Sequence, residues 1–331
     1  MALFRPISEA AAAGGSAAAG RPEAIKAIPV RHWGRWLSAA IVFYLVAALV
    51  YSFIRQPNVQ FDVIWQWLFK PTVMHGIVNT IELTIVAMVI GGVGGTILAV
   101  MRLSDNPVLT TISWVYIWFF RGTPVLVQIL IWGNLGVLYP RIFVGLPFTG
   151  IVFGSSASST VVSTTVAAIL ALGLNEAAYA AEIVRAGIIS VEPGQAEAAL
   201  SLGMPSGLTM RRVVLPQAMR VIIPPMGNET ISMLKTTSLV VVISGTELLS
   251  NLQIAYSQNF LIMPLLLVAC FWYIVMTTIL TVGQHYLEAY FGRGFGQRET
   301  EAAEKRAAKR AGKAGNALIA PDTKAGGEDH E

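Results

Sequence analysis

Charged side chains are scarce in this sequence of 331 residues. Asp, Glu, Lys and Arg together make up 13% of it, whereas soluble domains carry about 25%. Hydrophobic residues make up 54%. This shortage of charge excludes an ordinary soluble domain and indicates a polytopic membrane protein. Apolar and polar residues do not alternate with period two, which argues against a transmembrane β-barrel.

Residues that build disulfides, metal sites or nucleotide sites are also few. The one cysteine, Cys270, cannot form an internal disulfide, and within its apolar run it is interpreted as a small buried hydrophobe. The sequence has no G-x-x-x-x-G-K-[ST] phosphate loop. The four histidines are scattered and form no metal-ligand pattern; they are His32, His75, His285 and His330. We therefore expect no catalytic residue, no metal and no bound cofactor, and a membrane enzyme would lack its convergent catalytic set.

Long uncharged runs predict transmembrane helices, because about 20 apolar residues cross the hydrocarbon core. The run at 108–139 is too long for one straight crossing. Its sequence R-G-T-P at 121–124 is expected to break or kink the helix. The sequence therefore predicts an all-α polytopic membrane protein with six transmembrane helices. The predicted crossings are 36–54, 77–101, 108–139, 161–184, 228–249 and 260–283.

Lys and Arg are distributed unequally among the segments that connect these crossings. If the N-terminus lies inside, the inner segments carry eighteen of the 23 basic residues and the outer segments carry three. The positive-inside rule therefore predicts that both termini are cytoplasmic. Residues 1–35 and 291–331 are expected to be disordered cytoplasmic tails, because they contain little that could build a core.

Residues 197–216, EAALSLGMPSGLTMRRVVLP, separate the fourth and fifth predicted crossings. Their pattern E-A-A-x3-G-x9-V-x-L-P resembles the EAA loop in the membrane subunits of type I bacterial ABC importers. Further stretches resemble the permeases for polar amino acids of the histidine, glutamine and arginine branch, and the similarity covers 75–287. These stretches are FRGTPVLVQ (120–128), NEAAYAAEIVRAGI (175–188), LPQAMRVIIPPMGNE (215–229) and LKTTSLV (234–240).

The resemblance implies a type I transmembrane permease domain over 75–287, preceded by an extra N-terminal helix at 36–54. It also implies that the loop at 194–220 docks on an ATP-hydrolysing subunit. Within it, Gly203 is expected to turn the chain, Pro205 to start a second short helix, and Glu197 to lie at the start of the first, where the helix dipole favours its charge. The implied coupling residues are Glu197, Ala198, Ala199, Gly203, Leu215 and Pro216.

The same resemblance implies the partners and the location of the chain. The partners are an ABC ATPase subunit that uses the ATP, an extracytoplasmic solute-binding protein, a second permease copy that is identical or related, and membrane lipid; no nucleic acid is expected. The location is the bacterial plasma (inner) membrane. The expected function is that of the permease subunit of an ABC importer for polar amino acids. The alternative is an ion-coupled secondary transporter, which predicts inverted repeats and more spans than the sequence shows.

Polar side chains recur at helical spacing inside two crossings and suggest a substrate path. Ionisable groups inside the membrane cost about 2.5–3.5 kcal/mol on insertion scales and often mark functional sites. Positions 175, 179 and 182 share one helix face, as do 228, 232 and 235. An alternative interpretation is a structural Glu182–Lys235 pair that locks the two helices together. The candidate path residues, suited to a zwitterionic amino acid, are Asn175, Glu176, Tyr179, Glu182, Ser232, Lys235 and Ser238.

Three further features of the crossings carry expectations. Arg121 is expected to satisfy backbone carbonyls freed by the helix break rather than to line the path. Glu82 is expected to face a neighbouring helix or the mouth of the path. Gly91 and Gly95 form a G-x-x-x-G pattern, which predicts close packing of two helices.

Overall fold

The computed structural model describes residues 33–146, 149 and 151–291. The chain divides into two compact units, 1–56 and 57–331, and each is described by itself. In the first unit, helix α1 spans Trp33–Ile54 and is long and apolar enough to cross a membrane. The predictions for the two tails lie outside the described residues, apart from residues 33–35 and 291.

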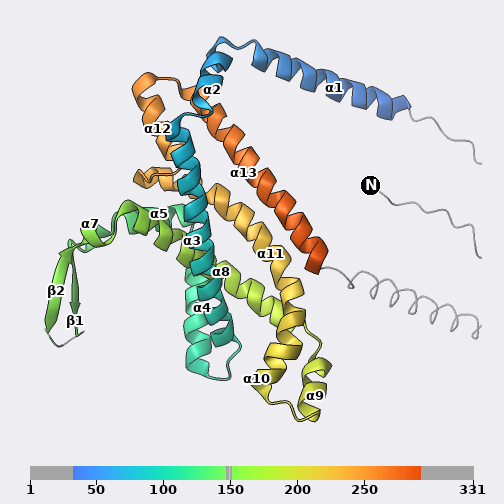
Figure 1. Ribbon diagram of the computed structural model, residues 1–331, viewed down its shortest axis with the longest axis vertical. Helices are drawn as coiled ribbons and strands as arrows, with labels where there is room; N and C mark the ends of the chain where they lie inside the picture. The colour runs from blue at the N-terminus through green and yellow to red at the C-terminus, as the bar shows by residue number, and fades with distance from the viewer. Residues whose placement is uncertain (1–32, 147–148, 150, 292–331) are drawn as a thin grey trace, which may run out of the picture. The chain divides into compact units, whose positions relative to one another are not determined.

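The second unit is built from apolar helices that pack side by side (Figure 1). Its first part contains the 3-10 turn η1 Pro57–Val59 and the helices α2 Phe61–Trp67, α3 Pro71–Arg102, α4 Pro107–Gly122, α5 Val125–Gly133, α6 Leu135–Leu138, α7 Ser158–Val161 and α8 Thr164–Ile189. Its second part contains α9 Pro193–Ser201, α10 Ser206–Thr209, the π-helical turn η2 Met210–Val214, α11 Leu215–Thr236, the 3-10 helix η3 Thr237–Ile243, α12 Leu248–Asn259 and α13 Ile262–Phe291.

Six membrane crossings can be assigned within the described residues by length and composition. Helices α1, α3, α8 and α13 each qualify alone. Two bent pairs add one span each: α4 with α5, bent by 98°, and the segment Ser206–Ile243 with α12, bent by 42°. The sharper bend falls at the predicted R-G-T-P break. The fifth predicted crossing, 228–249, begins inside a longer helix, because α11 begins at Leu215 and runs through Pro224 and Pro225.

Helix α3 packs along α8 through small residues, and this contact is the most extensive in the unit. A Cβ atom built on Gly95 would lie 2.5 Å from the Cβ of Ala180 and 2.8 Å from the backbone nitrogen of Ala181. A Cβ atom on Gly91 would lie 2.3 Å from the Cγ of Glu176. Only glycine permits this approach of the two backbones. The prediction of close packing at the G-x-x-x-G pattern is therefore confirmed.

Side chains at the helix starts satisfy backbone N–H groups that have no partner within the helix. Asn106 accepts from the N–H of Val108 at 2.9 Å, and Pro107 occupies the first position of α4. Ser163 caps α8, and Glu247 caps α12 by accepting from two backbone N–H groups. These local signals explain why the helices begin where they do.

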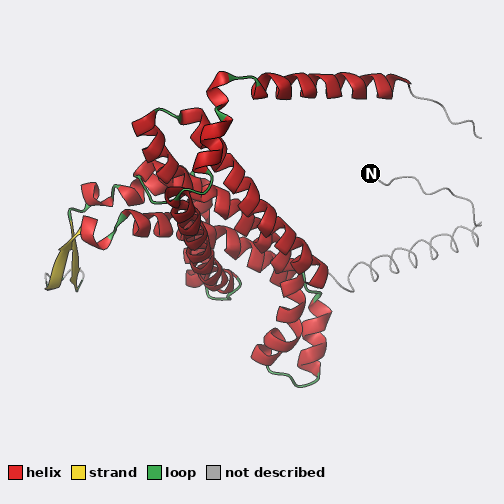
Figure 2. Cartoon of the chain, turned by 45° about the horizontal axis from the view of Figure 1, so that its top comes forward, coloured by secondary structure: helices red, strands yellow, loops and turns green. Residues whose placement is uncertain are grey.

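A β-hairpin between α6 and α7 was not predicted from the sequence (Figure 2). Strands β1 Arg141–Gly145 and β2 Val152–Ala157 pair antiparallel. The strands are short and almost wholly exposed, so no buried face imposes the alternation by which a strand is recognised.

The interpretation of Cys270 as a buried hydrophobe is wrong, because its side chain is exposed on α13. Helix α13 is apolar on all sides, but it packs against its neighbours on only part of its surface. In a membrane helix the lipid-facing side is as apolar as the packed side, so an apolar run does not reveal which residues are buried.

Candidate functional site

The site is organised around the break between α4 and α5. The carbonyl of Phe120, at the end of α4, accepts hydrogen bonds from the Nε2 of Gln128 at 3.0 Å and from the Nδ2 of Asn175 at 3.0 Å. The hydroxyl of Thr123 donates to a carbonyl one turn earlier. Polar side chains thus replace the helical bonds lost at the break. The expected role of Arg121 in satisfying these carbonyls is wrong, since Gln128, Asn175 and Thr123 perform it.

A polar cavity of about 540 Å³ lies beside this break, and we call it the central cavity. Helices α8 and α11 and the α4–α5 break contribute its walls. Four of the predicted path residues line it, namely Asn175, Glu176, Tyr179 and Ser232. Four further polar residues that were not assigned to the path line it as well, namely Arg121, Thr123, Glu229 and Thr236.

Three predicted path residues do not line this cavity: Glu182, which lines the cavities described below, Lys235 and Ser238. Lys235 is exposed, and Ser238 donates its hydroxyl hydrogen to the carbonyl of Lys235 at 2.7 Å. Of the polar row at 228, 232 and 235 on α11, Ser232 therefore lines the cavity, whereas Asn228 and Lys235 do not. Glu229, one position further on, faces the cavity, and its carboxylate within a predicted crossing was the signal that could have identified it.

Glu176 is the most deeply buried ionisable group of the central cavity. Its side chain is 2% exposed and lies against Gly91. Its Oε1 atom is buried and has no hydrogen-bond partner among the described residues. A buried carboxyl oxygen without a donor is unfavourable. A ligand that supplies an N–H donor to this oxygen would be stabilised in the cavity.

Arg121 connects the central cavity to two further cavities of about 450 and 390 Å³, which we call the inner cavities. Its guanidinium lies 5.1 Å from the centre of the Tyr179 ring, a cation–π contact. It forms no ion pair or hydrogen bond with another residue that the structure describes. The guanidinium is therefore free to bind an anionic group of a ligand.

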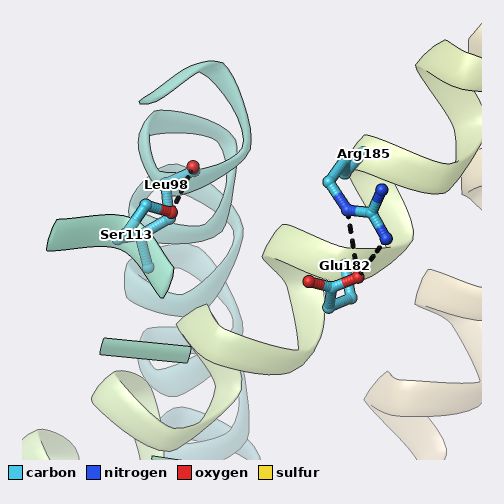
Figure 3. A network of polar contacts seen from close by, with 4 residues as sticks. All are labelled: Leu98, Ser113, Glu182 and Arg185. Carbon is cyan, nitrogen blue, oxygen red and sulfur yellow. Dashed lines mark hydrogen bonds and ion pairs between the residues drawn. The ribbon is translucent and has the colours of Figure 1, made fainter. Parts of the chain in front are cut away.

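Glu182 lines both inner cavities and is paired with Arg185 one helical turn further along α8 (Figure 3). The Glu182 Oε2 atom lies 2.7 Å from the Arg185 Nη2 atom. The hypothesis of a Glu182–Lys235 pair is therefore wrong. Figure 3 also shows the hydroxyl of Ser113, which donates to the carbonyl of Leu98 at 2.7 Å and joins α4 to α3.

The loop at 194–220 folds into two short helices joined by a turn. Gly203 has φ of +79°, a conformation that favours glycine, and Pro205 precedes α10 as its N-cap. Glu197 lies in the middle of α9, which begins at Pro193, so its expected place at the helix start is wrong. The dipole argument for its charge does not apply.

The loop presents apolar side chains on its surface. Leu202 is 83% exposed, and Leu200 and Met210 are also exposed. Of the candidate coupling residues, Ala199 is buried, and the others are exposed: Glu197, Ala198, Gly203, Leu215 and Pro216. Exposed apolar groups on a water-facing loop are typical of a protein contact surface.

The residues described by the structure contain no group of three or more His, Cys, Asp or Glu side chains that could hold a metal ion. The central cavity has two carboxylates, Glu176 and Glu229, and one guanidinium. Such a cavity can bind a ligand that carries both anionic and cationic groups.

Comparison with known proteins identifies the family. Residues 91–292 match the family described as binding-protein-dependent transport system inner membrane component. The arginine transport system permease protein ArgU of Corynebacterium glutamicum is 49% identical over 283 residues, which cover 85% of this chain and 87% of that protein.

Solved structures agree with this result. A crystal structure of an amino acid ABC transporter with histidines is 34% identical, with a TM-score of 0.56, and the match covers 66% of this chain and 94% of that chain. An inward-facing structure of the MetNI methionine ABC transporter is 16% identical, with a TM-score of 0.51, and the match covers 66% of this chain and 96% of that chain. At this identity the similarity concerns the fold alone.

These matches do not favour the ion-coupled alternative, because the similar proteins are permeases of ABC transporters. Their transmembrane fold is the type I importer fold that the loop pattern implied. The ATPase of such a system is a separate chain. The protein belongs to the inner membrane components of binding-protein-dependent transport systems, the non-catalytic permease subunits of ABC importers.

Proposed function

We propose that this chain is the permease subunit of an importer for a basic amino acid, driven by a separate ATPase and fed by an external binding protein. One observation carries the proposal: the central cavity contains two carboxylates and one free guanidinium. A basic amino acid has one carboxylate and two cationic groups. Arg121 would bind the carboxylate, and Glu176 and Glu229 would bind the α-ammonium group and the basic side chain.

The state of Glu176 supports this assignment. Its buried Oε1 atom has no donor among the described residues. An ammonium or guanidinium group of the substrate would supply that donor and would also compensate the buried charge. ArgU is named for arginine, and the solved amino acid transporter is described with histidines. Both names agree with a substrate that has a basic side chain.

The substrate would leave the central cavity past Arg121 and Tyr179 into the inner cavities. Glu182, paired with Arg185, forms part of their walls. A polar exit keeps a charged substrate out of contact with hydrocarbon. Lys235 and Ser238, which the sequence also placed on the path, lie outside the cavity walls, so we assign them no role in the path.

The loop at 194–220 is proposed to couple this path to the ATPase. Its coupling residues would be Glu197, Ala198, Ala199, Gly203, Leu215 and Pro216. The exposed side chains of Leu200 and Leu202 support this role, because they offer apolar area for a partner groove. A second permease copy, identical or related, is proposed to complete the transport pathway. We propose no cofactor for the chain itself, since the partner would use the ATP.

Glu176→Gln is expected to lower the initial rate of arginine uptake at least about tenfold, because loss of one partner from a buried charged contact typically costs 2–5 kcal/mol. Glu229→Gln is also expected to lower the initial rate of arginine uptake. The measurement is uptake of labelled arginine, glutamine and glutamate by the complete importer in proteoliposomes. Uptake of glutamine, which lacks the second cationic group, should fall less than that of arginine.

Asp62→Asn is the matched control for these variants. Asp62 is an exposed carboxylate on α2 and lines none of the cavities described above. Wild-type arginine uptake in both Glu176→Gln and Glu229→Gln, with normal assembly, would contradict the assigned site. Uptake of glutamine but not arginine by the wild-type importer would contradict the substrate class.

The proposed orientation places both termini in the cytoplasm, since Arg31 and Arg35 flank the first crossing and the predicted inner segments carry most of the basic residues. A cysteine reporter fused ahead of Met1, in a Cys270→Ser background, is expected to resist impermeant thiol reagents in intact spheroplasts. The same reporter should react after the membrane is permeabilised. Reaction in intact spheroplasts would overturn the proposed orientation.

A further inference from the structure

A separate cavity of about 290 Å³, with a mostly apolar lining and a few polar groups, lies between α3, the start of α8 and the segment that joins η3 to α12; we call it the outer cavity. It shares none of its lining residues with the central cavity. Its volume is close to the lower end of the range for ligand sites, which suits a small ligand. Its polar lining residues are Asn79, Glu82, Thr165, Thr246 and Glu247.

Glu82 is the carboxylate of this cavity that has no protein partner. It lies within α3, where its immediate neighbours Ile81 and Leu83 are apolar. The structure gives it no hydrogen bond or ion pair to another described residue. A carboxylate that faced lipid at this place would be costly. Because Glu82 lines a cavity, water or a ligand within the cavity can stabilise its charge.

The second carboxylate, Glu247, has its hydrogen-bonding capacity already in use. It is 2% exposed and accepts from the backbone N–H groups of Leu249 and Ser250 at 2.8 and 2.6 Å. It also accepts from the hydroxyl of Tyr273 at 2.8 Å. Glu247 therefore ties α12 to α13, and Glu82 is left as the carboxylate that can bind a ligand.

The other polar groups of the cavity offer acceptors beside Glu82. The Nδ2 atom of Asn79 donates to the carbonyl of Thr246 at 2.5 Å, and no described residue donates to the Asn79 side-chain oxygen. The hydroxyl of Thr165, at the start of α8, also lines the cavity. One negative charge with additional oxygen acceptors matches the three N–H donors of an ammonium group.

A layer of apolar side chains separates the outer cavity from the central cavity. Leu83, Ala168 and Val240 line the outer cavity and belong to one apolar cluster. Met233 and Val125 pack in the same cluster and line the central cavity. The two cavities are therefore both bounded by this cluster, and a shift of its side chains would connect them.

The segment that carries Val240 has the features of a hinge. Val240 lies on η3, a 3-10 helix of seven residues, which is longer than most 3-10 runs. The helix ends at Ser244, which has φ of +57°, an uncommon conformation for a residue other than glycine. Because η3 continues directly from α11, movement of α11 would displace Val240.

We propose that the outer cavity is a second binding station for the transported amino acid, in which Glu82 and the carbonyl oxygen of Asn79 hold its ammonium group before the apolar cluster opens. The inference rests on the proposed function, since the ligand is the same substrate. It adds a site ahead of the central cavity. The apolar cluster then keeps the two stations from being open to each other at rest.

The test places a thiol in the same cavity as Glu82. Thr165→Cys in a Cys270→Ser background leaves one cysteine in the chain, at an exposed position on the cavity wall. The complete importer in proteoliposomes is treated with a cationic and an anionic methanethiosulfonate of similar size. We expect the cationic reagent to react about tenfold faster relative to the anionic one, because a carboxylate-lined cavity concentrates cations. Glu82→Gln should abolish this preference, and arginine should slow the reaction.

Asp62→Asn is the control, because it removes an exposed carboxylate from α2, outside the cavity, and should leave the preference unchanged. Equal rates for the two reagents, or a preference that survives Glu82→Gln, would overturn the proposal. So would a thiol that reacts only after denaturation, since the cavity would then be closed to water.

The design separates the two proposals from each other. The charge preference depends on Glu82 and on the reagents, so it does not require the importer to carry arginine. If the preference is present but arginine gives no protection and is not transported, the substrate class is wrong while the cation site stands. If arginine is transported but the preference is absent, the outer station is wrong and the proposed function stands.

Discussion

Gly95→Val is expected to abolish the folded permease, while Gly92→Val on the same helix leaves it intact. A Cβ atom at position 95 would lie 2.8 Å from the backbone nitrogen of Ala181 and 3.0 Å from the carbonyl oxygen of Ala177. Backbone atoms cannot move aside as a side chain end can, so α3 and α8 would have to separate. Overpacking of a core costs about 1–3 kcal/mol even where side chains can adjust. We expect a larger cost here, because two of the close atoms belong to the backbone of α8.

The measurement is the yield of monodisperse permease by fluorescence-detected size exclusion, together with the amount of protein in the membrane. Gly92 is a matched control because nothing lies within 4 Å of a Cβ atom built there. Gly95→Val should insert but lose its monodisperse peak, whereas Gly92→Val should keep it. Equal peaks for the two variants would show that α3 and α8 do not pack as closely as the structure describes.

Gly203→Val is expected to uncouple the permease from its ATPase without unfolding the membrane helices. Gly203 has φ of +79°, and a residue other than glycine in the left-handed region costs on the order of 1–2 kcal/mol. A β-branched residue is especially unfavourable there. The turn between α9 and α10 would therefore rearrange and displace the exposed side chain of Leu202. The loop contributes little to the packing of the bundle, so insertion should be normal.

The space around Gly203 refines the expectation drawn from the sequence. Nothing in the chain lies within 4 Å of a Cβ atom built at this position, so the glycine is needed for its backbone conformation and not to avoid a clash within the chain. Gly203→Asn should retain more coupling than Gly203→Val, because Asn adopts the left-handed conformation more readily. Gly207→Val is the control, since Gly207 is equally open and lacks a positive φ.

Coupling is measured by co-purification of the ATPase with each variant and by substrate-stimulated ATP hydrolysis in liposomes. We expect Gly203→Val to lose most of both, Gly203→Asn to lose less, and Gly207→Val to remain close to the wild type. Wild-type coupling in Gly203→Val would show that the conformation of this turn does not matter for docking. Loss of the permease from the membrane would instead show that the loop is required for folding.

The sequence predicted features that depend on local spacing. Apolar run length predicted the crossings, and R-G-T-P at 121–124 predicted the break that bends α4 against α5 by 98°. Positions 175 and 179 share a helix face because 3.6 residues form a turn, and both side chains line the central cavity. The pair of Glu182 with Arg185, three residues away, also follows from local spacing, but it was not predicted, since the sequence hypothesis paired Glu182 with Lys235.

The composition of the site could not be predicted from local spacing, because its residues come from different helices. Arg121 from α4, Glu176 from α8 and Glu229 from α11 meet only after the helices have packed. Gln128 was missed because a single amide in an apolar run gives no indication that it will bond to Phe120 across the break. The hairpin was not predicted because its strands are exposed on both faces, so their sequence does not alternate between apolar and polar residues.

The sequence by itself therefore predicted that this protein is a helical membrane permease, approximately where its apolar helices lie and where one of them breaks. Tertiary structure alone decided how each helix is rotated about its axis: Glu229 faces the cavity while Lys235 is exposed, and Cys270 lies on the outside of α13. The physical reason is that lipid and protein interior are similarly apolar, so hydropathy does not encode the rotation of a membrane helix. Close contacts such as Gly91 against Glu176 and Gly95 against Ala180 set it instead.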